Sequence, residues 1–417
     1  DKNNQHHWRN FDIVCHRFFN IQNQIEKISQ DNFKFPLLLQ KRLPLKDLLL
    51  ITPPFTQLNT PYPATAYIKG FLNTKNISSY QCDLGIETIL ALFSKEGLIH
   101  LFQVIKEKEI ELSSNAKRIV ALQNDYIQSI EDVIAFLQGK NPTLAHLIGK
   151  RNFLPEASRF SQTTEMDWAF GTMGTQDKAK YLSTMYLEDL SDLITETVDE
   201  HFGFSRYAER LGRSANSFDQ LYETLQLQYT YIDHLYIDLL KEKIEKIQPK
   251  IVALSVPFPG NLYTSLRCGQ WIKKNHPAIK VAMGGGFANT ELRSISDPRV
   301  FEFYDFITLD DGEAPVENLI NYVEGKTSKE KLKRTFLLED GIVTYVNCKE
   351  TKDCKQGEVG TPDYSDLPLE QYISAIEVVN PMHRMWSDGR WNKLTMAHGC
   401  YWGKCTFCDI SLEIGRA

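Results

Sequence analysis

Short runs of consecutive apolar residues occur on both sides of a long stretch with a helical pattern. Apolar runs of this kind, bounded by proline, glycine or aspartate and alternating with helices, are typical of strands buried on both faces of a parallel sheet. We expect five such strands, two before the long stretch and three after it. They lie in KDLLLITPPF, SSYQCDLGIETILALFS, KIVALSV, AIKVAMGGG and DFITLDDGE.

The stretch between residues 94 and 245 has a different period. Apolar residues recur at i, i+3, i+4 and i+7 in IVALQNDYIQSIEDVIAFLQ, KAKYLSTMYLEDLSDLITETVDEHF and SFDQLYETLQLQYTYIDHLYIDLLKEKIEKI. This spacing predicts amphipathic helices. The tyrosines Tyr222, Tyr229, Tyr231 and Tyr236 belong to this pattern, and we interpret them as packing residues. The stretch is therefore interpreted as a helical insertion.

Strands that alternate with helices favour a doubly wound α/β fold with a five-stranded parallel sheet. Beyond it, TFLLEDGIVTYVN has Asp-Gly between β-forming residues and predicts a hairpin, and KQGEVGTPDYSDLPLEQY is rich in turn formers, as linkers are. The predicted organisation is a lead-in at 1–45, an α/β domain at 46–93 and 246–330, the helical insertion at 94–245, a hairpin and linker at 331–390, and the start of a further domain at 391–417.

Composition narrows the class of protein. The chain has 417 residues, 42% of them hydrophobic, which is enough for about two or three domains. The net charge of −6 gives no basic field for nucleic acid. No run approaches the roughly 18 to 20 apolar residues of a membrane span, and the beginning, DKNNQHHWRN, has no signal-peptide pattern. We therefore expect a cytoplasmic protein without a membrane partner. Because the first residue is Asp rather than Met, the true start is expected upstream.

The loops after the predicted strands are where a ligand is expected, because ligands of open parallel sheets bind outside the carboxyl ends of the strands. Gly284, Gly285 and Gly286 would let a ligand approach the backbone, and a tight turn explains them equally well. In DDGE, Asp311 and Glu313 are either functional carboxylates or, as we favour, a helix cap and a charge that complements the helix dipole. The common glycine-rich nucleotide-binding motifs do not occur.

Three cysteines near the end of the chain carry the strongest chemical signal. Cys400, Cys405 and Cys408 lie within nine residues, after a predicted strand in WNKLTMAHGC. Three thiolates in one loop can hold a soft metal centre. An iron–sulfur cluster is favoured, because aromatic neighbours would shield it from water and no second pair of zinc ligands is present. Zinc with His398 as the fourth ligand, or simple thiols, are the alternatives. A cluster held by three cysteines leaves one iron open to a small molecule.

The segment GCYWGKCTFCD closely resembles the cluster loop of radical S-adenosylmethionine enzymes, including the aromatic residue before the third cysteine. Its C-x4-C-x2-C spacing is one residue longer than the commonest C-x3-C-x2-C. The α/β domain looks like the cobalamin-binding domain that one branch carries ahead of its radical barrel, and TPDYSDLPLEQY is similar to the segment that joins the two. The resemblance covers roughly residues 46–93 and 246–417. The D-x-H-x-x-G motif of mutase-type cobalamin domains is replaced by TPPFTQLNTPYP. The radical branch generally lacks this motif, and its absence equally fits a domain that has lost cobalamin.

The resemblance implies a cobalamin-binding domain followed by the start of a radical (β/α) barrel. It implies a [4Fe-4S] cluster on Cys400, Cys405 and Cys408, S-adenosylmethionine bound to the open iron, cobalamin, and an electron donor such as flavodoxin or ferredoxin. The implied reaction is reductive cleavage of S-adenosylmethionine to a 5′-deoxyadenosyl radical, commonly for methyl transfer to carbon. The candidate cofactor contacts in the loops after the strands are Ser255, Pro257, Gly284, Gly285, Gly286, Asp311, Gly312 and Glu313.

The position of the cysteines near the end of the chain bears on whether the sequence contains the whole barrel domain. A (β/α)₈ barrel takes on the order of 200 residues or more, whereas nine residues follow Cys408. We therefore expect this chain to be part of a longer enzyme and to turn over no substrate alone. The alternatives are a non-enzymatic corrinoid-binding or sensor module with a structural zinc site, and a sheet domain that binds another nucleotide-like ligand.

Overall fold

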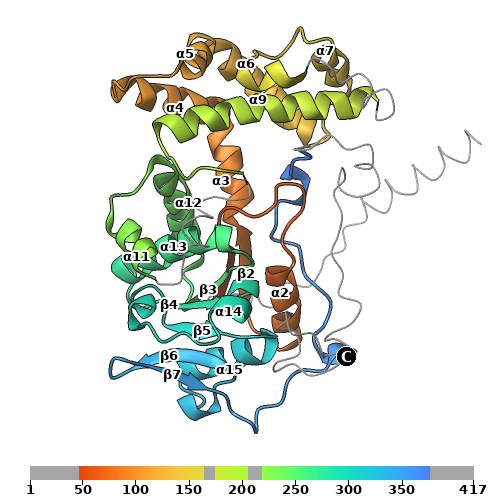
Figure 1. Ribbon diagram of the computed structural model, residues 1–417. Helices are drawn as coiled ribbons and strands as arrows, with labels where there is room; N and C mark the ends of the chain where they lie inside the picture. The colour runs from red at the N-terminus through yellow and green to blue at the C-terminus, as the bar shows by residue number, and fades with distance from the viewer. Residues whose placement is uncertain (1–46, 164–173, 205–217, 376–417) are drawn as a thin grey trace, which may run out of the picture. The chain divides into compact units, whose positions relative to one another are not determined.

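The computed structural model describes residues 47–163, 174–204 and 218–375, and Figure 1 shows its course. At its centre is a mixed seven-stranded sheet with the order β2-β1-β3-β4-β5-β6-β7. The strands are β1 (Leu48–Thr52), β2 (Ser79–Asp83), β3 (Ile251–Ser255), β4 (Lys280–Gly284), β5 (Phe306–Thr308), β6 (Thr335–Glu339) and β7 (Ile342–Val346). Strands β1 to β5 pair in parallel. The α/β class and the five predicted parallel strands are confirmed.

The predicted hairpin is confirmed as β6 and β7, and it joins the main sheet. Asp340 and Gly341 at its tip have φ angles of 47° and 79°, as a two-residue turn of type I′ requires. Strand β6 pairs antiparallel with β5, so the sheet is mixed rather than purely parallel. The hairpin joins the sheet because β6 is apolar on both sides, with Phe336 and Leu337 entering the cores on opposite faces of the sheet.

The strand order places a change of winding direction at β1 and β3. The chain leaves β1 toward β2 on one side, and on the other side β3, β4 and β5 follow in order. Loops that leave neighbouring strands in opposite directions open a crevice at the carboxyl edge. The helices α2 (Ala64–Thr74) and α15 (Glu313–Val323) contact each other on one face of the sheet (Figure 1). The other face is covered by α3 (Leu84–Leu92), α12 (Tyr231–Ile247) and α13 (Leu262–Asn275).

Successive strand residues point to opposite faces of a sheet. On the side of α13, which we call the α13 face, the strands contribute Leu49, Ile51, Val252, Leu254, Val281 and Met283 to one large hydrophobic core. On the other side, the α2 face, Leu48, Leu50 and Ile251 pack with Phe71 and Val316.

The stretch predicted as a helical insertion is helical in its described parts, and it shares its core with the α13 face. Its helices are α4 (Lys95–Glu107), α5 (Ser114–Ala121), α6 (Gln123–Leu137), α7 (Ala145–Gly149), α9 (Thr175–Thr197) and α11 (Asp219–Gln226), whereas α12, which also falls largely within the predicted 94–245, packs on the sheet with α3 and α13. Buried residues from these helices and from the strands belong to one continuous cluster. In the part of the chain that the structure describes, no single helix is long and apolar enough to cross a membrane. Only α3 and α4 taken together, across a bend of 70°, meet those two criteria.

The tyrosine pattern has the packing role that the sequence predicts. Tyr236 is fully buried, and Tyr222, Tyr229 and Tyr231 pack against the same core. The long helical pattern in this region is divided in two, because α11 ends at Gln226 and α12 starts at Tyr231. Thr230 caps α12 by accepting a hydrogen bond from the Asp233 N–H, with Asp233 bonding back in a capping box.

Candidate functional site

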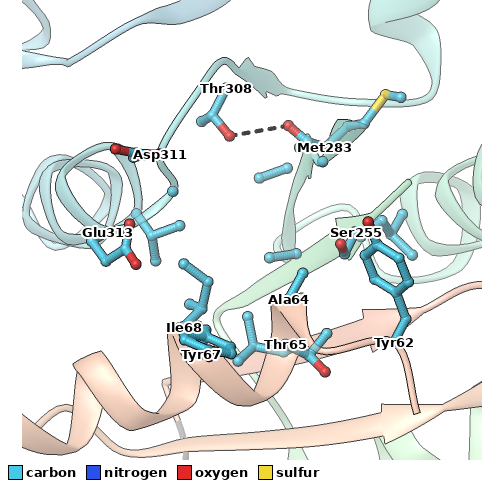
Figure 2. A pocket seen from close by; sticks show the side chains of 18 of the residues that line it. Tyr62, Ala64, Thr65, Tyr67, Ile68, Ser255, Met283, Thr308, Asp311 and Glu313 are labelled. Atoms are coloured by element: carbon cyan, nitrogen blue, oxygen red, sulfur yellow. Dashed lines mark hydrogen bonds between the residues drawn. The ribbon is translucent and has the colours of Figure 1, made fainter. Parts of the chain in front are cut away.

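A pocket of about 280 Å³ lies at the carboxyl edge of the sheet, on the α2 face. Its floor is the ends of β1, β3, β4 and β5, and its walls come from the region of α2 and from the first turn of α15 (Figure 2). The volume is near the lower end of the roughly 300–1,000 Å³ typical of small-molecule sites. The pocket therefore matches one ring system or one end of a larger ligand.

The floor of the pocket exists because side chains on the α2 face become smaller toward the carboxyl edge. Along β3 the residues of this face are Ile251, Ala253 and Ser255. In β4, Ala282 lies opposite Ala253 and Gly284 lies opposite Ser255. These small residues leave the space beneath α2 and α15 unfilled. We call the resulting pocket the slot.

The walls of the slot are largely apolar and partly aromatic. Figure 2 shows Ile68 and Tyr67 on α2 facing the strand ends, with Tyr62 standing beside the end of β3. Val316 on α15 completes the apolar lining. A flat, mostly apolar group can therefore pack between helix and sheet.

Two buried hydroxyl groups of the slot are without a hydrogen-bond partner among the described residues. They are the Oγ atom of Ser255 on β3 and the Oγ1 atom of Thr65 on α2. In contrast, Thr308 at the end of β5 donates from Oγ1 to the carbonyl of Met283 at 3.3 Å. A buried polar group without a partner is unfavourable by about 1–3 kcal/mol. A ligand with a polar atom near Ser255 would remove that penalty.

An exposed aromatic residue lies beside the mouth of the slot. Phe258, in the loop after β3, is 54% exposed. Its ring meets that of Tyr62 edge to face, with 5.8 Å between the ring centroids. Because Tyr62 lines the slot, the apolar lining continues outward onto an accessible surface.

The loop between β5 and α15 is held by two arginines. Asp310 has a φ of 62°, and its carboxylate, 1% exposed, is paired with Arg293 and, at 3.7 Å, with Arg334. Arg334 also donates to the carbonyls of Leu309 at 3.3 Å and Asp311 at 3.1 Å. These contacts fix the backbone that forms one end of the slot.

The predicted cap of the following helix is wrong. Gly312, rather than Asp311, is at the N-cap of α15, and it makes no side-chain cap. The physical reason is the conformation of Asp310, whose pairing with the arginines sets the chain direction before the helix. Glu313 is in the first turn, as predicted, where its charge complements the helix dipole. A Cβ on Gly312 would lie 2.8 Å from Ile68 Cδ1, the flexible end of a side chain that lines the slot.

The glycine run after β4 has two structural roles. Gly284 lines the slot. Gly285 has a φ of +104°, and a Cβ there would lie 2.6 Å from the carbonyl of Val256. A Cβ on Gly286 would lie 2.8 Å from the carbonyl of Pro257. The second and third glycines thus form a tight turn packed against the loop after β3.

The structure brings most of the predicted contact residues together. Those that line the slot are Ser255, Gly284, Gly285, Asp311, Gly312 and Glu313. Pro257 and Gly286 are not among its lining residues and lie in the adjoining turn. Tyr62, Thr65, Ile68 and Thr308 also line the slot and were not predicted from the sequence. The available signal was the position of Tyr62, Thr65 and Ile68 in the loop and helix that follow β1, another carboxyl-edge connection.

The predicted metal ligands Cys400, Cys405 and Cys408 lie outside the described residues. Among the residues that are described, no group of three or more His, Cys, Asp or Glu side chains is placed to hold a metal ion. Cys82 and Cys268 are buried, as predicted for structural thiols. Burial raises the pKa of both thiols above the ordinary value.

Comparison with known proteins gives no relative. No family model, curated protein or solved structure matches this chain. The slot and the sequence are therefore the features of this chain that bear on its function.

Proposed function

We propose that this chain belongs to a cobalamin-dependent radical S-adenosylmethionine enzyme and that its α/β domain binds the corrinoid. The observation that carries the corrinoid part is the slot, a small-residue hollow at the switch point of the sheet with the buried, unpaired hydroxyl of Ser255. The iron–sulfur part depends on the sequence around Cys400, Cys405 and Cys408.

The residues of the slot fit the planar base of a cobalamin nucleotide tail. A flat heteroaromatic ring can lie on Ala253 and Ala282 with Ile68 and Val316 packed around it. The Ser255 hydroxyl can then donate to a ring nitrogen and gain the hydrogen bond that it lacks. A slot of about 280 Å³ would hold that base, and the exposed ring of Phe258 offers an apolar surface for the remainder.

The loop after β1 supports the radical branch over the mutase type. Residues 53–63 read PPFTQLNTPYP and include no histidine. That loop therefore supplies no imidazole to cobalt. Corrinoid binding would depend on the nucleotide tail in the slot and on apolar contact with Phe258 beside the mouth of the slot.

When bound, the cluster, S-adenosylmethionine and cobalamin supply a 5′-deoxyadenosyl radical and a transferable methyl group. Cys400, Cys405 and Cys408 would hold the cluster through their thiolates. The slot residues would orient the corrinoid tail and exclude water from it. The linker is anchored to the loop after β1, because the Ile373 N–H donates to the carbonyl of Leu58 at 2.8 Å.

Binding of hydroxocobalamin to the whole chain tests the corrinoid part. After incubation and gel filtration, the corrinoid should co-elute with the wild type. Ala253→Leu should reduce its affinity at least about tenfold, because a leucine there occupies the floor of the slot. Ala121→Leu makes the same change at an exposed position on α5 and should bind like the wild type. Failure of the wild type to bind, or normal binding by Ala253→Leu, would contradict the assignment.

Anaerobic reconstitution with iron and sulfide tests the cluster part. The expected result is a broad visible absorbance that is lost in Cys405→Ala. Stoichiometric zinc in place of iron would instead favour a corrinoid-binding module with a structural metal site, in which His398 could serve as the fourth ligand.

A further inference from the structure

Helix α2 contacts different parts of the structure on two of its sides. One side lines the slot with Ala64, Thr65, Tyr67 and Ile68. The other contacts the linker after the hairpin through Ala66, Lys69, Gly70 and Asn73. These four residues have the i, i+3, i+4, i+7 spacing that forms one stripe of a helix. The helix thus separates the slot from the linker and touches both.

Lys69 is the main polar contact between α2 and the linker. Lys69 is only 6% exposed. Its Nζ donates to Ser365 Oγ at 2.9 Å and to Asp366 Oδ2 at 2.5 Å, and lies 3.4 Å from Asp363 Oδ2. A buried ammonium is stable only when it is paired, and loss of its partners is strongly unfavourable. Docking of the linker is therefore what allows Lys69 to be buried.

The backbone of the linker lies directly on α2. A Cβ on Gly70 would be 2.1 Å from the carbonyl oxygen of Thr361, so only glycine permits this approach. Within a helix, glycine is less favourable than alanine by about 1 kcal/mol. The Asp363 N–H donates to the Ala66 carbonyl at 2.9 Å, and Gln81 Nε2 donates to the Asp363 carbonyl at 2.5 Å. The linker is thus bound to both α2 and the edge strand β2.

The far end of the linker is anchored at the carboxyl edge of the sheet. The hydroxyl of Tyr372, which is fully buried, donates to Asp83 Oδ2 at 2.8 Å. Asp83 is the N-cap of α3 and accepts from the N–H groups of Gly85 and Ile86. The Ser374 N–H donates to the carbonyl of Leu137 at 2.9 Å. The chain therefore leaves the described region from a fixed point.

We propose that residues 360–373 form a strap whose docking on α2 is coupled to occupation of the slot, with Lys69 as the positioning residue that acts through α2. A ligand that holds the slot side of α2 favours the docked strap, and the docked strap favours the ligand by the same factor. The use of hydroxocobalamin as the probe rests on the proposed function. The coupling between strap and helix does not.

Hydrogen exchange on the full chain, with and without hydroxocobalamin, tests the coupling. The informative amides are those of Asp363 and Ile373, which are bonded to Ala66 and Leu58. We expect both to exchange more slowly when the probe is bound, although neither lines the slot. Unchanged exchange at both amides in the loaded protein would overturn the proposal and leave the binding assignment intact.

Two substitutions test the same coupling from the strap. Gly70→Ala strengthens α2 as a helix but displaces Thr361. It should speed exchange at Thr65–Ile68 and weaken hydroxocobalamin binding about fivefold or more, in the range of typical couplings. A role in helix stability alone predicts slower exchange. Lys69→Met should act in the same direction as Gly70→Ala, and Lys69→Arg should largely restore binding. The matched control is Lys241→Met, an exposed lysine on α12, which should change neither measurement.

The two possible failures can be distinguished. If the wild type binds no hydroxocobalamin, the proposed function fails, and the exchange of Thr65–Ile68 in Gly70→Ala without ligand still decides the coupling. Faster exchange there supports the strap. Exchange equal to or slower than in the wild type contradicts it.

Discussion

The two faces of the sheet differ although the same strands build both. In β3, Leu254 points into the large core of the α13 face, while its neighbours Ala253 and Ser255 line the slot on the α2 face. In β4, Met283 belongs to the core, although it also borders the slot, and Gly284 lines the slot without belonging to the core. A binding site can therefore be set into a sheet by reducing every second side chain, without disturbing the residues between them.

Within a single strand, the residues that point to the α13 face contribute to stability, and those that point to the α2 face are available for binding. The α13 face is filled, and filled interiors respond to the loss of even a methylene group. The α2 face has two smaller clusters and a cavity that is already open. Substitutions one residue apart should therefore have different consequences, and this expectation can be tested.

The largest effect is expected on the α13 face. Leu254→Ala removes a side chain that is 1% exposed and should lower the free energy of unfolding by about 2–5 kcal/mol, because it leaves a cavity in a packed core. Urea denaturation measures this change. Ser255→Ala is the adjacent comparison, and a similar loss of stability in both variants would contradict the distinction between the faces.

A smaller effect, with a defined pH dependence, is expected at the end of β2. Burial raises the pKa of Asp83 from 3.8 to about 6, partly offset by the hydrogen bond from Tyr372. The folded state therefore binds a proton more tightly than the unfolded state. The contribution of Asp83 to stability is present below about pH 4 and is lost as the pH rises through about 6. Relative to Asp83→Asn, the wild type should lose about 3 kcal/mol between these limits.

Urea titrations at several pH values would test this difference. Asp189, whose pKa is also raised to about 6 by burial, is present in both proteins, so the comparison isolates Asp83. A constant difference between wild type and Asp83→Asn from about pH 4 to about pH 7 would exclude the raised pKa.

The smallest loss of stability is expected on the α2 face. The Ser255 hydroxyl is unpaired among the described residues, so Ser255→Ala should leave the free energy of unfolding unchanged or raise it by up to about 1–3 kcal/mol. The same variant should bind hydroxocobalamin about three- to tenfold more weakly, as the loss of one hydrogen bond predicts. Equal affinity in both proteins would remove Ser255 from the proposed contact set.

The sequence predicts the strands and the hairpin because their signals are local. Asp340 and Gly341 alone specify the turn type. The slot is harder to predict, because a strand buried on both faces has a continuous apolar sequence. The sequence IVALS does not show which face of the sheet is left with a cavity by small side chains. Ser255 and Gly284 could still be predicted, because ligands of parallel sheets bind at the carboxyl ends of the strands. Thr65 and Ile68 could be identified only once the position of α2 over the slot was known.

Long-range contacts explain the remaining differences. Lys69 reads as an exposed residue of an amphipathic helix, and its burial depends on Ser365 and Asp366, nearly 300 residues away. The cap of α15 was misassigned for a similar reason, since Asp310 pairs with Arg334 from the hairpin. Local patterns carry no information about such partners.

The continuous core shared by the insertion and the α13 face limits how this chain can be shortened. A deletion that joined Ser94 directly to Thr230 would remove the packing partners of Leu92 and Tyr236, both fully buried in that core. The product would expose a large apolar surface and aggregate rather than fold as a smaller protein. Evolutionary loss of these helices would thus require simultaneous redesign of α3 and α12.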